Sequence, residues 1–199
     1  MLMLSFFKSL FLFSSGIYLC GASCRSFAPA EKTNTSSIPL APVFIVPECD
    51  HRNGIEKVYF KLTRRDSVTV EEITVVFRDE DQPFFLFDGI YDVYRRAKYH
   101  RKKDMETFFM HINTQTSSLN YVYFEDTYSG EQRFRKGIVK HYQEVVTGTL
   151  LEWQVGRPVI YINTWNHLFS ESDTNPELAK QIYLDYPCYK GARTDAEPH

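Results

Sequence analysis

Short runs of β-branched and aromatic residues recur along this chain, with only a few polar or glycine residues between consecutive runs. Runs of this length and composition predict β-strands. We expect strands at residues 58–62, 68–77, 84–87, 107–112, 119–125, 149–155 and 159–165. Consecutive strands joined by short turns pair as antiparallel neighbours. The sequence therefore predicts a mostly β fold, an antiparallel meander that closes as a barrel or a sandwich.

One stretch near the C-terminus predicts a helix. Pro176 suits a first helical turn that Asn175 can cap, and Leu178 and Ile182 share one face. We therefore expect one C-terminal helix over residues 176–184. Two other stretches are ambiguous: residues 134–146 combine helical spacing with β-branched pairs and are interpreted as a strand, and residues 91–100 remain undecided.

The length and composition indicate a single folded domain. A chain of 199 residues with 43% hydrophobic residues can bury a substantial core. We assign the domain to residues 43–190 and a flexible tail to residues 191–199. The formal net charge of −2 gives no reason to expect specific nucleic-acid binding.

The N-terminal segment has the pattern of a targeting signal. Residues 1–24 carry one charge, Lys8, followed by an apolar run and the small residues Gly21-Ala22-Ser23. This pattern predicts a secretory signal peptide over residues 1–23, and an uncleaved anchor or a buried helix are the alternatives. We therefore expect a secreted or extracytoplasmic protein.

The residues after the apolar run raise the question of a membrane anchor. The sequence Gly21-Ala22-Ser23-Cys24 resembles the lipobox of bacterial lipoproteins, which implies lipidation of Cys24. Residues 24–42 are rich in Ser, Thr, Pro and Ala and predict a disordered linker or tether. The protein would then be anchored to a membrane through Cys24.

Outside residues 1–24 the chain has two cysteines, Cys49 and Cys188. An oxidising compartment would permit a disulfide between them, which we expect to tie the start of the domain to its end. The alternative is two free, buried thiols. The chain has no Cys-x-x-Cys motif, and we expect no structural zinc site and no other metal or cofactor.

Aromatic residues on two predicted strands suggest a ligand site. Alternation along a strand places Tyr121 with Tyr123, and Tyr161 with Asn163 and Trp165, on single faces. We expect both faces to point to a common interior, where hydroxyl and amide groups could orient an apolar or sugar ligand. The alternative is that these side chains are only core. The candidate ligand-binding residues are Tyr121, Tyr123, Tyr161, Asn163, Trp165 and His167.

Residues 95–103 form a dense basic run in an otherwise acidic chain. Such a run can bind an anionic partner or surface, although charge runs are more often solvated loops. The candidate anion-binding residues are Arg95, Arg96, Lys98, Arg101, Lys102 and Lys103.

The sequence contains none of the common catalytic or phosphate-binding motifs, and we propose no catalytic residue. The first hypothesis is therefore an extracytoplasmic binding protein, whose partner is a small apolar or sugar ligand or another protein. The alternatives are a secreted hydrolase or lyase with a site near residues 165–167, and a structural envelope protein tethered by lipid.

Overall fold

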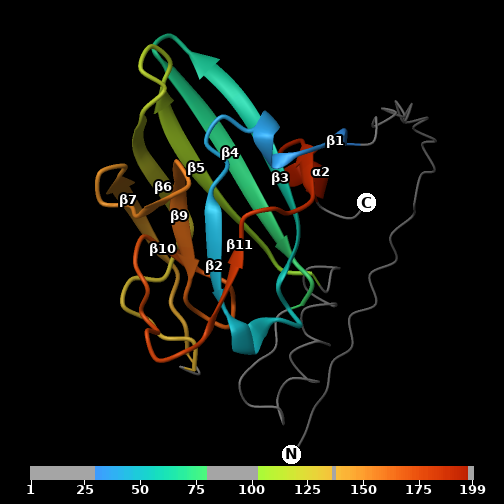
Figure 1. The fold of residues 1–199 in the computed structure, drawn as a ribbon, viewed down its shortest axis with the longest axis vertical. Coiled ribbons are helices and arrows are strands. Elements are labelled where there is room, and N and C mark those ends of the chain that lie inside the picture. The colour runs from blue at the N-terminus through green and yellow to red at the C-terminus, as the bar shows by residue number, and fades with distance from the viewer. Residues whose placement is uncertain (1–29, 80–102, 136–137, 197–199) are drawn as a thin grey trace, which may run out of the picture.

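The computed structural model describes residues 30–79, 103–135 and 138–196. Strands predominate within these residues, and they form one sheet of twelve strands. The sheet curls on itself into a half-barrel (Figure 1). The predicted class, a mostly β fold with one helix near the C-terminus, is confirmed.

The centre of the sheet is the predicted meander. Each strand pairs antiparallel with the next one in the chain. These strands are β3 (Ile55–Arg65), β4 (Val68–Phe77), β5 (Met105–Asn113), β6 (Leu119–Tyr128) and β7 (Tyr142–Thr147).

Shorter strands from the two ends of the chain complete the sheet. They are β1 (Lys32–Thr33), β2 (Val43–Pro47), β8 (Trp153–Gln154), β9 (Arg157–Ile162), β10 (Phe169–Ser170), β11 (Lys180–Tyr183) and β12 (Cys188–Lys190). The order is β1-β12-β3-β4-β5-β6-β10-β9-β2-β11, with β7 on β6 and β8 on β9. Three of the pairings are parallel, namely β12 with β3, β2 with β9 and β10 with β6. The sheet is therefore mixed outside the meander.

The core fills the concave side of the half-barrel. Alternation turns one set of apolar side chains inward from every long strand, and four phenylalanines contact one another at its centre. The ring of Phe108 lies 5.0 Å from that of Phe169, 5.7 Å from Phe124 and 6.3 Å from Phe44. All four side chains are completely buried, and burial of each stabilises the fold by roughly 1.5–3 kcal/mol.

The predicted helix at residues 176–184 is wrong in position. Residues 180–183 form β11, which pairs antiparallel with β2 from Lys180 opposite Pro47 to Tyr183 opposite Phe44. Residues 180–183 form hydrogen bonds with the backbone of β2, and these bonds stabilise the strand more than the local sequence stabilises a helix. Among the described residues, the α-helix is α2 (Arg193–Ala196), and two short 3-10 helices are η1 (Thr35–Ser37) and η2 (Glu48–Asp50).

Part of the segment expected to be a tether belongs to the fold. β1 pairs with β12, and the side chains of Ile38 and Ala41 are buried in the core. The apolar residues scattered in this Ser- and Thr-rich stretch explain why it packs from Ala30 onward.

The predicted signal peptide, Cys24 and the strand expected at residues 84–87 lie outside the described residues, as does the undecided stretch 91–100. No helix among the residues described is long and apolar enough to cross a membrane.

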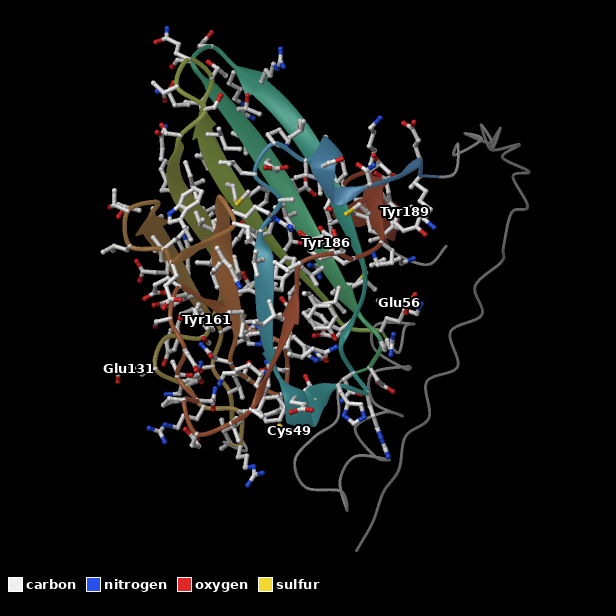
Figure 2. The ribbon with its side chains drawn as sticks, in the orientation of Figure 1. Cys49, Glu56, Glu131, Tyr161, Tyr186 and Tyr189 are labelled. Carbon is white, nitrogen blue, oxygen red and sulfur yellow. The ribbon has the colours of Figure 1, made fainter. Side chains whose placement is uncertain are left out.

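The expected disulfide between Cys49 and Cys188 is not formed, and both thiols are free. Cys188 is buried in β12, where it pairs with Val58 of β3 and its thiol donates to the carbonyl of Tyr186. Cys49 is exposed in η2 at the lower end of the molecule in Figure 2, far from Tyr189, the neighbour of Cys188. The two elements are on different parts of the half-barrel, which sequence separation alone could not reveal.

We expect the two thiols to react at very different rates. In protein lacking the first 29 residues, Cys49 should react with a thiol reagent under native conditions, and Cys188 only after unfolding. Burial and the neighbouring Asp50 raise the pKa of Cys49, so its reaction in the native protein should accelerate at alkaline pH. Burial raises the pKa of Cys188 to about 11 and so keeps this thiol unreactive until the protein unfolds. Absorbance assays on native and on denatured, unreduced protein measure this, and a denatured protein without reactive thiols would contradict the structure.

Candidate ligand-binding site on the outer face of the sheet

The meander turns a second set of aromatic residues outward. In β5 the side chains of Phe108 and Met110 face the core, so Phe109 and His111 face out. In β6 the same alternation turns Tyr121 and Tyr123 outward between the core residues of that strand. The two strands therefore carry aromatic side chains on the same convex face.

The strand register brings these four rings together in pairs. Phe109 lies opposite Tyr123, and His111 lies opposite Tyr121. The rings of Phe109 and Tyr123 stack at 6.0 Å and 26°, and those of His111 and Tyr121 at 4.2 Å and 19°. All four side chains are half-buried. Cross-strand aromatic pairs of this kind stabilise a sheet, and we name Phe109, His111, Tyr121 and Tyr123 the aromatic platform.

The surroundings of His111 and Tyr123 favour the uncharged forms of both rings. Burial and the nearby Arg65 lower the pKa of His111. Burial and the carboxylates of Glu125 and Asp126 raise the pKa of Tyr123. The platform therefore offers neutral aromatic faces beside a charged surface.

A cavity of about 420 Å³ adjoins the platform at Phe109. We call it the acidic groove, because four carboxylates line it against one guanidinium. Its lining residues are Glu72, Glu106, Thr107, Phe109, Glu125, Asp126, Thr127, His141 and Arg193. A ligand on the platform would meet both hydrogen-bond acceptors and one strong donor here.

Arg193 comes to the groove from the end of the chain. Its backbone N–H donates to a carboxylate oxygen of Glu72 at 2.9 Å, and its guanidinium donates to the hydroxyl of Thr107 at 3.0 Å. These bonds dock α2 against β4 and β5. The C-terminal helix therefore forms one wall of the groove.

His141 is fixed by two hydrogen bonds. The side-chain amide of Asn166 lies 3.2 Å from Nε2, and Nδ1 lies 2.7 Å from the carbonyl oxygen of Asp126. An amide N–H can only donate, so Nε2 accepts, and Nδ1 carries the proton that it donates to the carbonyl. The two bonds therefore fix the orientation of the His141 ring in the wall of the groove.

The other predicted ligand-binding residues do not belong to the aromatic platform or line the acidic groove. Tyr161 lies on β9 (Figure 2), packs against Val43 and Val159, and donates a hydrogen bond to Glu152 at 2.7 Å. Trp165 is only 6% exposed. The expectation that these residues share an interior with Tyr121 and Tyr123 is wrong, because the face of β6 that carries the two tyrosines is the convex one.

Asn163 belongs to the framework of a loop. Its amide donates to the carbonyl of Ser172, and its side-chain oxygen accepts from the backbone N–H of Thr174. The side chain of Asn175 donates to the carbonyl of Asn163. These bonds bring the segment after β10 back against the end of β9.

His167 lies at the centre of a buried ionic cluster. Its Nδ1 is 2.8 Å from a carboxylate oxygen of Asp104, and its Nε2 is 3.1 Å from one of Asp50. Its side chain is completely buried and its ring stacks on that of Phe77 at 3.9 Å and 5°. Burial alone would lower its pKa, but hydrogen bonds and charge from the two aspartates raise it to about 10. We name these residues the Asp50–His167–Asp104 cluster.

Both imidazole nitrogens in this cluster are engaged and neither reaches the surface. The cluster joins η2, the start of β5 and the turn between β9 and β10. Asn53 donates a further hydrogen bond to Asp50 at 3.0 Å. The arrangement therefore ties three distant segments together, and no imidazole nitrogen is left to exchange a proton with a substrate.

Of the predicted anion-binding residues, the structure describes Lys103. It is exposed and forms an ion pair with Glu56 at 2.5 Å. The remaining residues lie outside the described part of the chain: Arg95, Arg96, Lys98, Arg101 and Lys102.

Sequence reasoning missed most of the acidic groove, whose residues come from β4, β5, β6, the β6–β7 connection and α2. A signal was available for Phe109 and His111, since they alternate with apolar residues inside a clear strand. No pattern in the sequence could place Arg193 or His141 beside them, because that depends on register and on the docking of α2.

No protein-family model matches this chain, and no curated protein matches it. Among solved structures, the chain is similar to "NLPPya in complex with mannosamine" and "NLPPya in complex with glucosamine". The identities are 9% and 8%, and each comparison has a TM-score of 0.38 and covers 67% of this chain. This chain spans 49% of the length of each of those chains. A likeness at this level carries no argument about function.

Proposed function

We propose that the protein is an extracytoplasmic binding protein that takes a saccharide on the convex face of its sheet. The observation that carries the proposal is the aromatic platform beside the acidic groove. Flat aromatic rings pack against the apolar face of a sugar ring, while carboxylates and a guanidinium bind its hydroxyl groups. The platform supplies the first kind of contact, and the groove supplies the second.

The charge of the groove favours a saccharide that carries an amine. Glu72, Glu106, Glu125 and Asp126 give four negative charges, against the one positive charge of Arg193. A protonated amine would interact favourably with this excess of carboxylates, in a salt-dependent way. A neutral sugar of the same shape would stack on the platform but would lack the attraction between an amine and the carboxylates.

We expect glucosamine to bind more tightly than glucose, by about fivefold at low salt, with the difference reduced at high salt. Changing Tyr121 and Tyr123 together to Ala should weaken glucosamine binding at least about fivefold, because each stacked contact contributes roughly 0.5–1.5 kcal/mol. Changing Glu125 to Gln should reduce the preference for glucosamine over glucose. Isothermal titration calorimetry measures all three results.

Tyr142→Ala provides a matched control, because Tyr142 is an exposed tyrosine on β7 that lines neither the platform nor the groove. It should leave glucosamine binding unchanged. Equal losses in Tyr142→Ala and in the Tyr121/Tyr123 double variant, or no binding of either sugar by the wild-type protein, would refute the proposed site.

A further inference from the structure

A second unusual group lies on the inner side of the same sheet. Glu71 and Glu72 are consecutive in β4, so they face opposite sides. Glu72 lines the acidic groove, and Glu71 points into the half-barrel, where its exposure is 0%. In the register of the sheet it lies between Leu62 of β3 and Met110 of β5. A carboxyl group therefore occupies a position that would normally hold an apolar side chain.

Neither carboxyl oxygen of Glu71 makes a close hydrogen bond with the described residues, although the backbone of Leu40 lies near enough to favour the charged form of the carboxyl group. The polar groups near it are engaged elsewhere: the hydroxyl of Tyr186 donates to the carbonyl of Pro42 at 2.8 Å. The guanidinium of Arg157, beside Tyr186, donates to backbone carbonyls of Ala41, Pro42 and Leu184. A buried polar group without a partner destabilises a fold, and this one requires an explanation.

A cavity of about 430 Å³ opens at the end of the half-barrel where two hairpins meet, and Glu71 lies one inward row below it without lining it. Its lining residues are Pro39, Leu40, Leu62, Arg64, Asp66, Thr69, Ile112, Asn113, Thr114 and Ser117. Leu62 is the strand partner of Glu71, and Thr69 is the next inward residue on its own strand. Glu71 thus forms the row directly beneath the cavity.

The contacts in this region restrict the ligand. Leu40, Leu62 and Ile112 provide apolar walls, and the free carboxyl group below them offers two oxygens side by side. An amidinium or guanidinium group presents two parallel N–H donors that match a carboxylate in this geometry. Leu62 lines the cavity opposite Glu71 and is 41% exposed, so a ligand that displaces its side chain toward solvent would reach the carboxyl group.

We propose that this cavity is a second ligand site, specific for a small apolar molecule that carries an amidinium or guanidinium group, with Glu71 as the anchoring carboxylate. The site is separate from the convex face, and the proposal does not depend on saccharide binding.

Binding should be coupled to the release of a proton. Burial raises the pKa of Glu71 to about 8, and the nearby backbone of Leu40 offsets only part of this. Near pH 6.5 the carboxyl group is therefore protonated, and pairing with a cation requires it to ionise. The charged and titratable groups that face this region are Arg64 and Asp66 at the cavity, and Tyr186 with the adjacent Arg157 below it.

Benzamidine is a suitable probe, because it is an amidinium on a small apolar ring. Calorimetric titration at about pH 6.5, in two buffers of different ionisation enthalpy, gives both the dissociation constant and the number of protons released. We expect binding with the release of nearly one proton. Glu71→Gln should weaken binding at least tenfold and abolish the proton release, and Glu72→Gln, on the opposite face of the same strand, should change neither.

A cavity-filling variant, Thr69→Trp, retains Glu71 and should also abolish binding, which keeps the test valid if Glu71→Gln does not fold. Absence of benzamidine binding to the wild-type protein would overturn the proposal. So would binding without proton release, or equal binding by the wild type and Glu71→Gln. Glucosamine titrations of Glu71→Gln and Thr69→Trp, which lie on the inner face of β4, should be unchanged, so failure here is distinguishable from failure of the convex-face site.

Discussion

Replacing His167 with Gln is expected to lower the free energy of unfolding by roughly 3–5 kcal/mol, because it removes one partner of a buried ionic cluster. The substitution would leave the carboxylates of Asp50 and Asp104 close together, buried and without their shared cation. It would also remove the ring that stacks on Phe77. Chemical denaturation near pH 6 measures the loss, and His141→Gln, at an exposed histidine, should cost much less.

The contribution of His167 should depend on pH in a defined direction. Its pKa in the folded protein is raised to about 10, above the ordinary value of 6.5. The folded state therefore keeps a proton that the unfolded state releases, so the stabilisation is complete below about pH 6.5 and is lost between that pH and about 10. The difference in stability between wild type and His167→Gln should shrink over this interval, and a constant difference would show that the imidazole is not charged in the folded protein.

Replacing Glu71 with Met is expected to raise the free energy of unfolding by roughly 1–4 kcal/mol near neutral pH, since an apolar side chain of similar size can fill the same position in the core. The present side chain has two buried oxygens that make no close hydrogen bond within the described part of the chain. The pKa of Glu71 is raised from 4.5 to about 8, so the folded state again binds a proton that the unfolded state releases. The stabilising effect of Glu71→Met should therefore grow between about pH 4.5 and 8 and stay constant above that.

Denaturation of both proteins at several pH values tests this expectation, with Glu72→Gln on the outer face of β4 as a control. A Glu71→Met protein that is less stable than wild type at pH 8 would mean that Glu71 has a stabilising partner. These two groups should make the wild-type protein less stable as the pH rises. Glu71 loses its proton at up to about pH 8, and His167 loses its proton at up to about pH 10. The two variants separate the contributions.

The meander was predictable from sequence because it depends on local properties. Strands β3, β4, β5 and β6 alternate apolar and polar residues and end at polar or glycine turns, so each can be recognised by itself. The parallel pairings of β2 and β12 could not be predicted, because a short strand carries no information about which distant strand it will join. The same limit explains residues 180–183, where pairing with β2 prevails over a helical pattern.

The candidate sites divide in the same way. Tyr121 and Tyr123 were correctly assigned to one face, but the direction of that face depends on how the whole sheet curls. The burial of a carboxyl group in β4 could have been predicted. Two consecutive Glu residues inside a strand face opposite sides of the sheet, so one of them faces the core. The Asp50–His167–Asp104 cluster unites residues up to 117 positions apart and has no local pattern at all.

The arrangement of the terminal strands has a consequence for how the chain acquires its structure. β2 lies between β9 and β11, and β3 is covered on one side by β12. During synthesis β2 therefore has no partner until more than a hundred further residues have been made, whereas the meander can form from contacts between neighbours. High contact order of this kind slows folding, so we expect a nascent chain in which the meander forms early and the edges close only when the last strands arrive. Until β12 has been made, β3 keeps an unpaired edge, which is a template that a strand of another chain could join.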